Sequence, residues 1–355
     1  MKYLVSIVLL VLGRYRRNRG WYNKNTLALF HRAYKLNPNS LVLLHYIRFR
    51  RDMGNLLRRR LALQLLSVFH KLRGKQCRQA ANLLIESGFE KQLRSSIDIT
   101  ALSPFVLQSP PIASLVSSDI RPVGYSEVLS ELYRNQSVWR REFRHYLLQR
   151  NHSICVVGNS GSIIGSQNGN TIDQYDVVVR FNCYSSAFSN AEDVGNKITV
   201  WSCAPNCTEL FIERFALEYA EPEWNILSGP DVHYQMMNWQ AVAQFINKKN
   251  KLLTVPLTVW NSLVRLLYAP PSAGLLLLSW IIDMRGNAKD LVVTGFDIDA
   301  TTKRYHQALP GHKAVTRHNW EGEKKILQKW KVQGLVVLES DGFIRKNTHE
   351  SITYL

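Results

Sequence analysis

A glycine-rich turn between two apolar runs is the stretch of this sequence whose residue types best suit an anionic ligand. The run Ile154–Val157 has the length and β-branched content of a buried strand, and it leads into Gly-Asn-Ser-Gly at 158–161. A second run, 177–179, closes on Arg-Phe-Asn at 180–182. At the carboxyl ends of parallel strands, such a turn presents backbone N–H groups and amide or hydroxyl side chains to a ligand, typically a phosphate.

A second anion site is predicted where a later apolar helix begins. Pro271 and Ser272 precede an apolar run that extends to about residue 284. Ser272 is a natural N-cap, so the freed N–H groups of the first helical turn, at Ala273 and Gly274, can face an anion. A further strand, 291–294, follows this helix and ends in Gly-Phe-Asp at 295–297.

Two polar stretches near the C-terminus carry side chains that suit proton transfer or phosphate contact. The first is Arg-Tyr-His-Gln at 304–307, and the second places His318 five residues before Glu323. Histidine titrates near neutral pH and is therefore a candidate general base. A histidine without a motif around it is more often an ordinary surface or packing residue than a catalytic one, and this holds for His318 taken alone.

These stretches, taken in order, carry a resemblance to a known family. The motifs are GNSG, then IDxYDxVxRFN, a DVG turn, PSAG before an apolar helix, VTGFDID and a late HxxxxE. Together they resemble the large, small, third and very small sialylmotifs of the eukaryotic-type sialyltransferases, glycosyltransferase family 29. The resemblance covers about half of the chain, from 154 to 338, and leaves the middle, 203–269, unmatched.

The resemblance implies an α/β, nucleotide-binding, Rossmann-like fold of the GT-A-variant type and a role for each matched residue. The donor substrate would be cytidine-monophosphate sialic acid (CMP-sialic acid), and the acceptor a hydroxyl of a glycan. Its nucleotide would be bound by Asn159, Ser160, Gly161, Asn182, Ser272, Ala273, Gly274, Gly295 and Phe296. The implied phosphate contacts are Arg304, Tyr305 and His306, the general base is His318, and Asp193 and Glu323 give structural support.

The sequence departs from the family pattern at three positions. Ala273 replaces the usual Thr of the small motif and loses one hydroxyl near the nucleotide. The third motif usually opens with His-Tyr, so the phosphate contact here falls to either Arg304 or His306. Ala288 stands where the family's disulfide partner of Cys155 is expected, which argues against that disulfide and weakens the case for an oxidising compartment.

The family inverts the configuration of the sugar in one displacement, and it needs no metal or other cofactor. Asp297 and Asp299 imitate the Asp-x-Asp metal site of other glycosyltransferases, but a structural role at the strand end is preferred here. Cys203 and Cys207 lack further ligands at zinc spacing. We therefore expect no metal site.

Two other functions are weighed against this one. A dinucleotide-dependent oxidoreductase would use Gly158, Gly161 and Gly165 as its glycine fingerprint, but its second strand should end in an acidic residue, and here it ends in Asn182. A non-catalytic interaction protein would use the helical N-terminal part and carry a decayed transferase domain. The intact His318 and Ser272 argue against decay.

Charge and hydropathy divide the chain into four parts. The net charge of +18 suggests an anionic partner. We expect a short apolar and basic segment at 1–20, a helical region at 21–102 that is either tetratricopeptide-like or a small helical cap, a linker rich in Pro and Ser at 103–123, and the catalytic domain at 124–355. The arginines of the helical region lack a nucleic-acid motif, so no nucleic acid is expected as a partner.

The N-terminal segment bears on location. Its apolar run, 3–12, is short of the roughly twenty residues of a spanning helix, and the arginines after it favour contact with a membrane surface. Sequons at Asn135, Asn151 and Asn206 are compatible with the secretory pathway. We expect a membrane-associated protein, in the Golgi if eukaryotic and at the cytoplasmic side of the inner membrane if bacterial.

Overall fold

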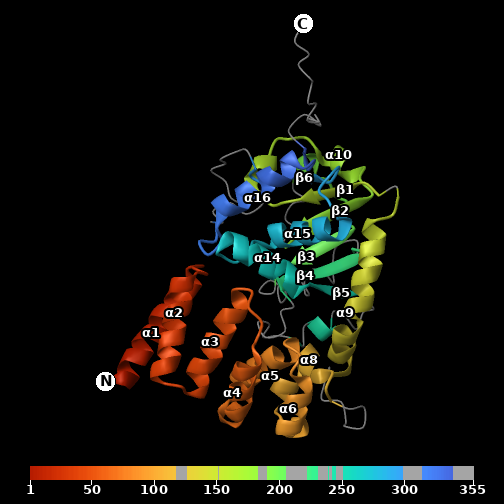
Figure 1. The fold of residues 1–355 in the computed structure, drawn as a ribbon. Coiled ribbons are helices and arrows are strands. Elements are labelled where there is room, and N and C mark those ends of the chain that lie inside the picture. Colours follow the sequence, from red (N-terminus) through yellow and green to blue (C-terminus); the bar gives the residue numbers. More distant parts are fainter. Residues whose placement is uncertain are drawn as a thin grey trace.

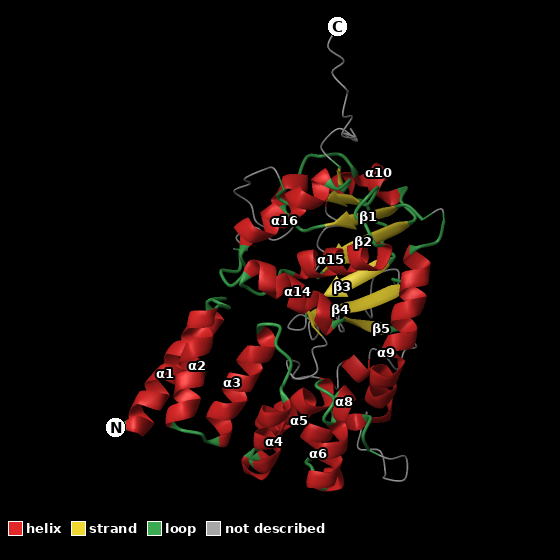
Figure 2. Cartoon of the chain, in the orientation of Figure 1, coloured by secondary structure: helices red, strands yellow, loops and turns green. Residues whose placement is uncertain are grey.

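The computed structural model describes residues 1–116, 126–150, 152–182, 190–204, 222–230, 239, 242–244, 251–298 and 314–338. A unit built around a sheet lies above a group of N-terminal helices, which run from red to orange in Figure 1. Figure 2 shows strands in the upper part and only helices in the lower part. The predicted α/β fold behind a helical N-terminal region is confirmed.

In the described ranges, seven strands form one parallel sheet with the order β5-β4-β3-β2-β1-β6-β7. The strands are β1 (Ile154–Val157), β2 (Val177–Phe181), β3 (Val200–Cys203), β4 (Trp224–Pro230), β5 (Leu252–Val255), β6 (Val292–Thr294) and β7 (Val336–Val337). Parallel strands are covered on both faces, which is why the inner ones read as unbroken apolar runs in the sequence.

Alternate residues of the strands pack into two different hydrophobic cores, one on each face of the sheet. Ile154 and Val156 pack in the large core with α9 (Ser126–Leu147), α14 (Leu257–Leu267) and α15 (Ala273–Arg285). On the opposite face, Cys155 and Val157 pack with η3 (Gly161–Ile163), α10 (Gly169–Asp173) and α11 (Ala191–Val194). The last helix, α16 (Trp320–Val332), contributes Leu327 to the large core.

The N-terminal helices do not form one separate core. The first three pack through Leu10, Phe30 and Phe49 into the large core of the sheet, beside Trp260 of α14. The following helices gather around Leu65 and Leu84 in a second core. In order, the helices of this part are α1 (Lys2–Asn18), α2 (Lys24–Leu36), α3 (Ser40–Asp52), α4 (Arg59–Ser67), η1 (Phe69–Lys71), α5 (Gly74–Glu86), α6 (Glu90–Ser96), η2 (Ile99–Ala101), α7 (Pro104–Leu107) and α8 (Pro110–Ala113).

The segment expected as a linker differs from that expectation over its described part, 103–116. It forms α7 and α8, and Val106, Leu107 and Ile112 are buried in the second core. Proline fits the first turn of a helix, so a Pro-rich stretch with regularly placed apolar residues can pack instead of linking. The remainder of the expected linker, 117–123, lies outside the described residues.

The helix α1 extends well past the apolar run that predicts it. Its small residues Ser6 and Gly13 face α2, where Ser6 Oγ donates to the carbonyl of Ala33 at 2.9 Å and Gly13 meets the ring of Phe30. In the part of the chain that the structure describes, no helix is both long and apolar enough to cross a membrane.

Candidate functional site

The sheet order places a ligand-binding position at the carboxyl end of β1. This strand lies between β2 and β6. The chain runs from β1 outward through β2 to β5 on one side, and then returns to form β6 and β7 on the other side of β1. In open parallel sheets, ligands bind outside the carboxyl ends of the strands at such a switch point. The glycine turn after β1, the end of β2 and the turn after β6 therefore meet at one edge of the sheet.

The turns after β1 and β6 are in direct backbone contact. Gly158 donates its N–H to the carbonyl of Thr294 at 2.8 Å, and Ser160 donates to the carbonyl of Gly295 at 3.0 Å. A Cβ added at either Gly158 or Gly295 would collide with the carbonyl oxygen of the other. Gly295 also has a φ of +67°, which favours glycine. The two glycines thus set the distance between the turns.

Asn159 and Asn182 lie at neighbouring strand ends. The side-chain amide of Asn159 donates to the carbonyl of Phe181 at 3.1 Å. Asn182 adopts a φ of +48°, and its side-chain oxygen accepts from the N–H of Ala204 at 2.8 Å. That bond leaves the NH2 group of Asn182 as a donor and one lone pair of its oxygen as an acceptor for a nucleotide. Nucleotide binding by both residues stays a prediction.

Hydroxyl and aromatic side chains close the space between the turns. The hydroxyl of Ser160 donates to Asp297 Oδ1, and Ser160 Oγ also accepts from Ser162 N at 3.2 Å. Phe296 stands edge-on to Phe181, with ring centroids 6.3 Å apart. Its ring also covers Gly274, where an added Cβ would lie 3.1 Å from the ring edge. The first turn of α15 is therefore brought to the same edge of the sheet as the glycine turns.

Ser272 caps α15 as the sequence predicts, and it is also bound by a buried carboxyl group. Its Oγ accepts from the N–H of Leu275 at 3.2 Å. Glu323 accepts from Ser272 N at 2.7 Å and from Ser272 Oγ at 2.6 Å. The hydroxyl proton is therefore directed at Glu323, and only a lone pair of the oxygen is left for a ligand. Glu323 is 4% exposed, and this burial raises its pKa to about 7.

The raised pKa predicts a pH-dependent contribution of Glu323 to stability. Below about pH 4.5 the carboxyl is protonated in both the folded and the unfolded chain, and its full contribution to the free energy of unfolding is present. As the pH rises from 4.5 to about 7, the unfolded chain releases its proton first, so folding loses up to about 3 kcal/mol. Urea unfolding of the wild type between pH 5 and 8 measures this loss.

The variant Glu323→Gln isolates the effect. Glutamine keeps an acceptor for Ser272 N but does not titrate, so the decline in unfolding free energy over this window should shrink. His318 acts in the opposite direction, because its lowered pKa costs stability as the pH falls, and the variant leaves that effect in place. An unchanged decline in the Gln variant would show that Glu323 does not cause it.

His318 is held in the neutral form and in one tautomer. Its Nδ1 lies 2.8 Å from the carbonyl oxygen of Pro270. A carbonyl only accepts, so Nδ1 carries the proton and Nε2 keeps its lone pair. Burial lowers the pKa of the half-buried ring, and its edge-on neighbour Trp320 lies 5.2 Å away between centroids. At neutral pH this imidazole can accept a proton at Nε2.

The segment that carries His318 is tied to the start of α15 at several points. His318 contacts Pro270, Glu323 contacts Ser272, and Asn319 donates to the carbonyl of Leu267 at 2.9 Å. Asn319 also caps α16 by accepting from the N–H of Gly322 at 2.9 Å. These contacts therefore fix the position of the candidate base relative to the candidate anion site at α15.

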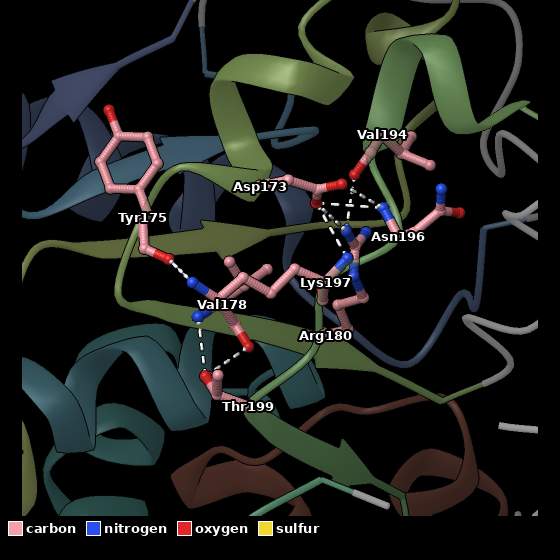
Figure 3. A network of polar contacts seen from close by, with 8 residues as sticks. All are labelled: Asp173, Tyr175, Val178, Arg180, Val194, Asn196, Lys197 and Thr199. Atoms are coloured by element: carbon pink, nitrogen blue, oxygen red, sulfur yellow. Dashed lines mark hydrogen bonds and ion pairs between the residues drawn. The ribbon is translucent and has the colours of Figure 1, made fainter. Parts of the chain in front are cut away.

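A buried arginine supports the end of β2, as Figure 3 shows. Arg180 is 2% exposed and donates to the carbonyls of Lys197 at 2.8 Å and Val194 at 2.6 Å. Asp173 lies 3.8 Å from its guanidinium and accepts from the backbone N–H groups of Asn196 and Lys197. Sequence reasoning missed this network, although both charged residues lie within the IDxYDxVxRFN motif.

Several predicted site residues have a local role or lie outside the described residues. Asp193 accepts from the N–H groups of Gly165 at 2.7 Å and Gln167 at 3.0 Å, so it shapes the loop after η3. Gly161 begins η3. The positions outside the described residues are Arg304, Tyr305, His306 and Asp299.

Nothing in the described ranges forms a cluster of His, Cys, Asp or Glu suited to hold a metal ion. Cys155 is buried in the core, which raises the pKa of its thiol to about 12, and Ala288 is buried as well.

One protein-family model matches the part of the chain that contains the turn after β1 and the start of α15. Residues 122–278 match the model of glycosyltransferase family 29 (sialyltransferase). No curated protein matches the chain in sequence.

Among solved structures, a mammalian sialyltransferase shares 18% identity at a TM-score of 0.44, over 67% of this chain and 85% of its own. The same coverage, with 17% identity and a TM-score of 0.43, is found for a mammalian sialyltransferase in complex with Gal-beta-1-3GalNAc-ortho-nitrophenol. The monofunctional alpha-2,3-sialyltransferase Cst-I from Campylobacter jejuni shares 14% identity at a TM-score of 0.36, over 55% of this chain and 78% of its own. At these TM-scores the likeness carries no weight for fold or activity.

Proposed function

Because residues 122–278 match the model of glycosyltransferase family 29, the sialyltransferases, we propose that the chain transfers sialic acid from CMP-sialic acid to a hydroxyl of an acceptor glycan, with inversion and without a metal ion. The observation that supports this most is the neutral tautomer of His318, tied to the first turn of α15 beside the switch point of the sheet. A proton acceptor and an anion site are the two groups that such a transfer requires.

In the proposed reaction, the acceptor oxygen bonds to the anomeric carbon while the bond to the phosphate oxygen of the donor breaks. His318 Nε2 takes the hydroxyl proton, and CMP leaves with the bonding electron pair. The N–H groups at the start of α15 and in the turn after β1 stabilise the phosphate as its charge grows. Arg304 or His306 adds a cation in the same proposal.

The test is CMP release by the purified full chain supplied with CMP-sialic acid, with and without sugar acceptors. Release should rise with a suitable acceptor and should be unchanged by excess chelator, because no step of the proposal uses a metal. In parallel calorimetric titrations, CMP should bind and NAD should not.

Two outcomes would contradict these proposals. Binding of NAD without binding of CMP would favour an oxidoreductase. Loss of CMP release in chelator, with recovery on addition of manganese, would make Asp297 and Asp299 a metal site.

We also propose that α1 lies on a membrane surface. From residue 3 to residue 15, the side of this helix that faces away from α2 exposes apolar side chains, which are Tyr3, Leu4, Val5, Ile7, Val8, Val11, Leu12 and Tyr15. Arg14 and Arg19 are exposed at its C-terminal end, where they can meet anionic headgroups. This pattern is typical of a helix that lies in the membrane interface. Such a position agrees with the membrane-associated location expected above.

Flotation with vesicles that contain anionic lipid tests the membrane contact. The wild type should float with the vesicles, and Leu4→Gln with Val8→Gln should weaken binding by about tenfold or more, because two apolar side chains no longer enter the lipid. Both side chains are exposed, so the fold should be unaffected. Equal flotation of wild type and variant would refute the proposal.

A further inference from the structure

The helical region contains a pocket that is distinct from the candidate transferase site. It has a volume of about 520 Å³, within the usual range for a small ligand, and lies between α2, α3 and the start of α4. Its cations are Lys35, Arg50, Arg58 and Arg60, and no residue that lines it is acidic. This α2–α4 pocket therefore gathers positive charge without an internal counter-charge.

The cations of the α2–α4 pocket lack partners that would neutralise them. In the described residues, no carboxylate forms an ion pair with any of the four. The buried Nε of Arg50 has no hydrogen-bond partner there, and its guanidinium lies 5.8 Å from the ring centre of Tyr46. Burial, together with the charges of Lys35 and Arg50, lowers the pKa of His31 in the same wall. These groups repel one another unless an anion joins them.

The start of α4 adds an independent reason to expect an anion. Arg58 is its N-cap and makes no side-chain cap, Arg59 and Arg60 follow, and no acidic residue lies in the first turn. A helix N-terminus is itself positive, so arginines here destabilise the helix and a negative group would stabilise it. The unpaired N–H groups of this turn are further donors for an anion.

The remaining wall suits a hydroxylated ligand. Tyr34 donates its hydroxyl to Gln64 Oε1 at 3.2 Å, which leaves the amide NH2 of Gln64 as a donor. His31 stacks on Tyr46 with centroids 5.3 Å apart, and neutral imidazole both donates and accepts. Neutral polar groups thus stand beside the cations.

We propose that the α2–α4 pocket binds the phosphate ester of a small hydroxylated molecule, either free in solution or as the headgroup of a lipid. A phosphate monoester carries close to two negative charges and three terminal oxygens, and it matches the planar fork of arginine. A single carboxylate would balance only one of the four cations. This site does not depend on the transferase reaction proposed above.

The test uses the full chain and two probes with the same chemistry. Glycerol 3-phosphate is titrated by calorimetry, and vesicles of phosphatidylcholine are compared with vesicles that also contain phosphatidic acid. Arg58→Gln and Arg60→Gln should each weaken binding of the pocket's probe by about tenfold, because each removes charged hydrogen bonds to phosphate. Arg59→Gln is the matched control, since all three arginines are exposed and Arg59 lies between the other two but does not line the pocket.

Each outcome decides the proposal. Binding of glycerol 3-phosphate that falls in Arg58→Gln and Arg60→Gln but not in Arg59→Gln supports a free ester. The same pattern seen only with phosphatidic acid supports a lipid headgroup. Equal losses in all three variants, or no binding of either probe, would overturn the site and leave only the general basic charge of the chain.

Discussion

Replacing His318 by Ala should reduce the rate of sialyl transfer by about 10² or more and leave donor binding nearly intact, as expected when a general base is lost. The structure gives the physical reason. The carbonyl of Pro270 fixes the proton on Nδ1, and burial lowers the pKa, so Nε2 can accept a proton at neutral pH. Single-turnover kinetics with bound CMP-sialic acid measures the transfer step directly.

His306 provides the comparison. If it contacts the leaving phosphate, His306→Ala should weaken donor affinity, whereas His318→Ala should slow transfer alone. Circular dichroism and CMP titration show whether each variant is folded and binds nucleotide. Transfer at a near-normal rate by folded His318→Ala would assign the base elsewhere, with His306 as the first alternative.

The sheet was predictable from the sequence because its strands are covered on both faces. An unbroken β-branched run of this length favours a buried strand, and β1 has the predicted bounds. The N-cap at Ser272 was also predictable, since serine before an apolar helix satisfies the free N–H groups of its first turn. Local patterns of this kind depend on neighbours in the chain.

The contacts between distant segments were not predictable in the same way. Glu323 binds Ser272 across 51 positions of sequence, and only the fold brings the two together. The helix α14 was missed although Trp260, Leu263 and Leu267 follow helical spacing, because its segment lies in the unmatched middle of the chain.

The N-terminal helices contact the catalytic unit close to His318. Tyr22 donates its N–H to the carbonyl of Tyr268 at 3.0 Å, and a Cβ added at Gly20 would meet the carbonyl of Arg317, next to the candidate base. Trp260 of α14 donates to the carbonyl of Asp52 at 3.2 Å. An amphipathic pattern predicts a helix, but it does not predict which surface of the protein that helix packs against. Their position here makes α1 to α3 part of the wall around the segment that carries His318.

The second large effect is expected at the crossing of the two turns. Gly295→Ala should lower the free energy of unfolding by about 2–5 kcal/mol, the sum of left-handed strain at φ +67° and overpacking. The new Cβ would lie 2.5 Å from the carbonyl oxygen of Gly158, which belongs to the turn after β1 and cannot rotate away as a side chain would. Urea unfolding followed by circular dichroism gives the loss.

Gly286→Ala separates the two contributions. Gly286 has a φ of +79° at the end of α15, but an added Cβ there meets no atom within 4 Å, so only the strain of about 1–2 kcal/mol should appear. If Gly295→Ala remains folded under mild conditions, CMP affinity should fall as well, because the methyl group forces apart the turns that carry Asn159 and Phe296. Equal losses of stability in the two variants would mean that the turns yield to the methyl group, and that their close approach does not set the shape of the site.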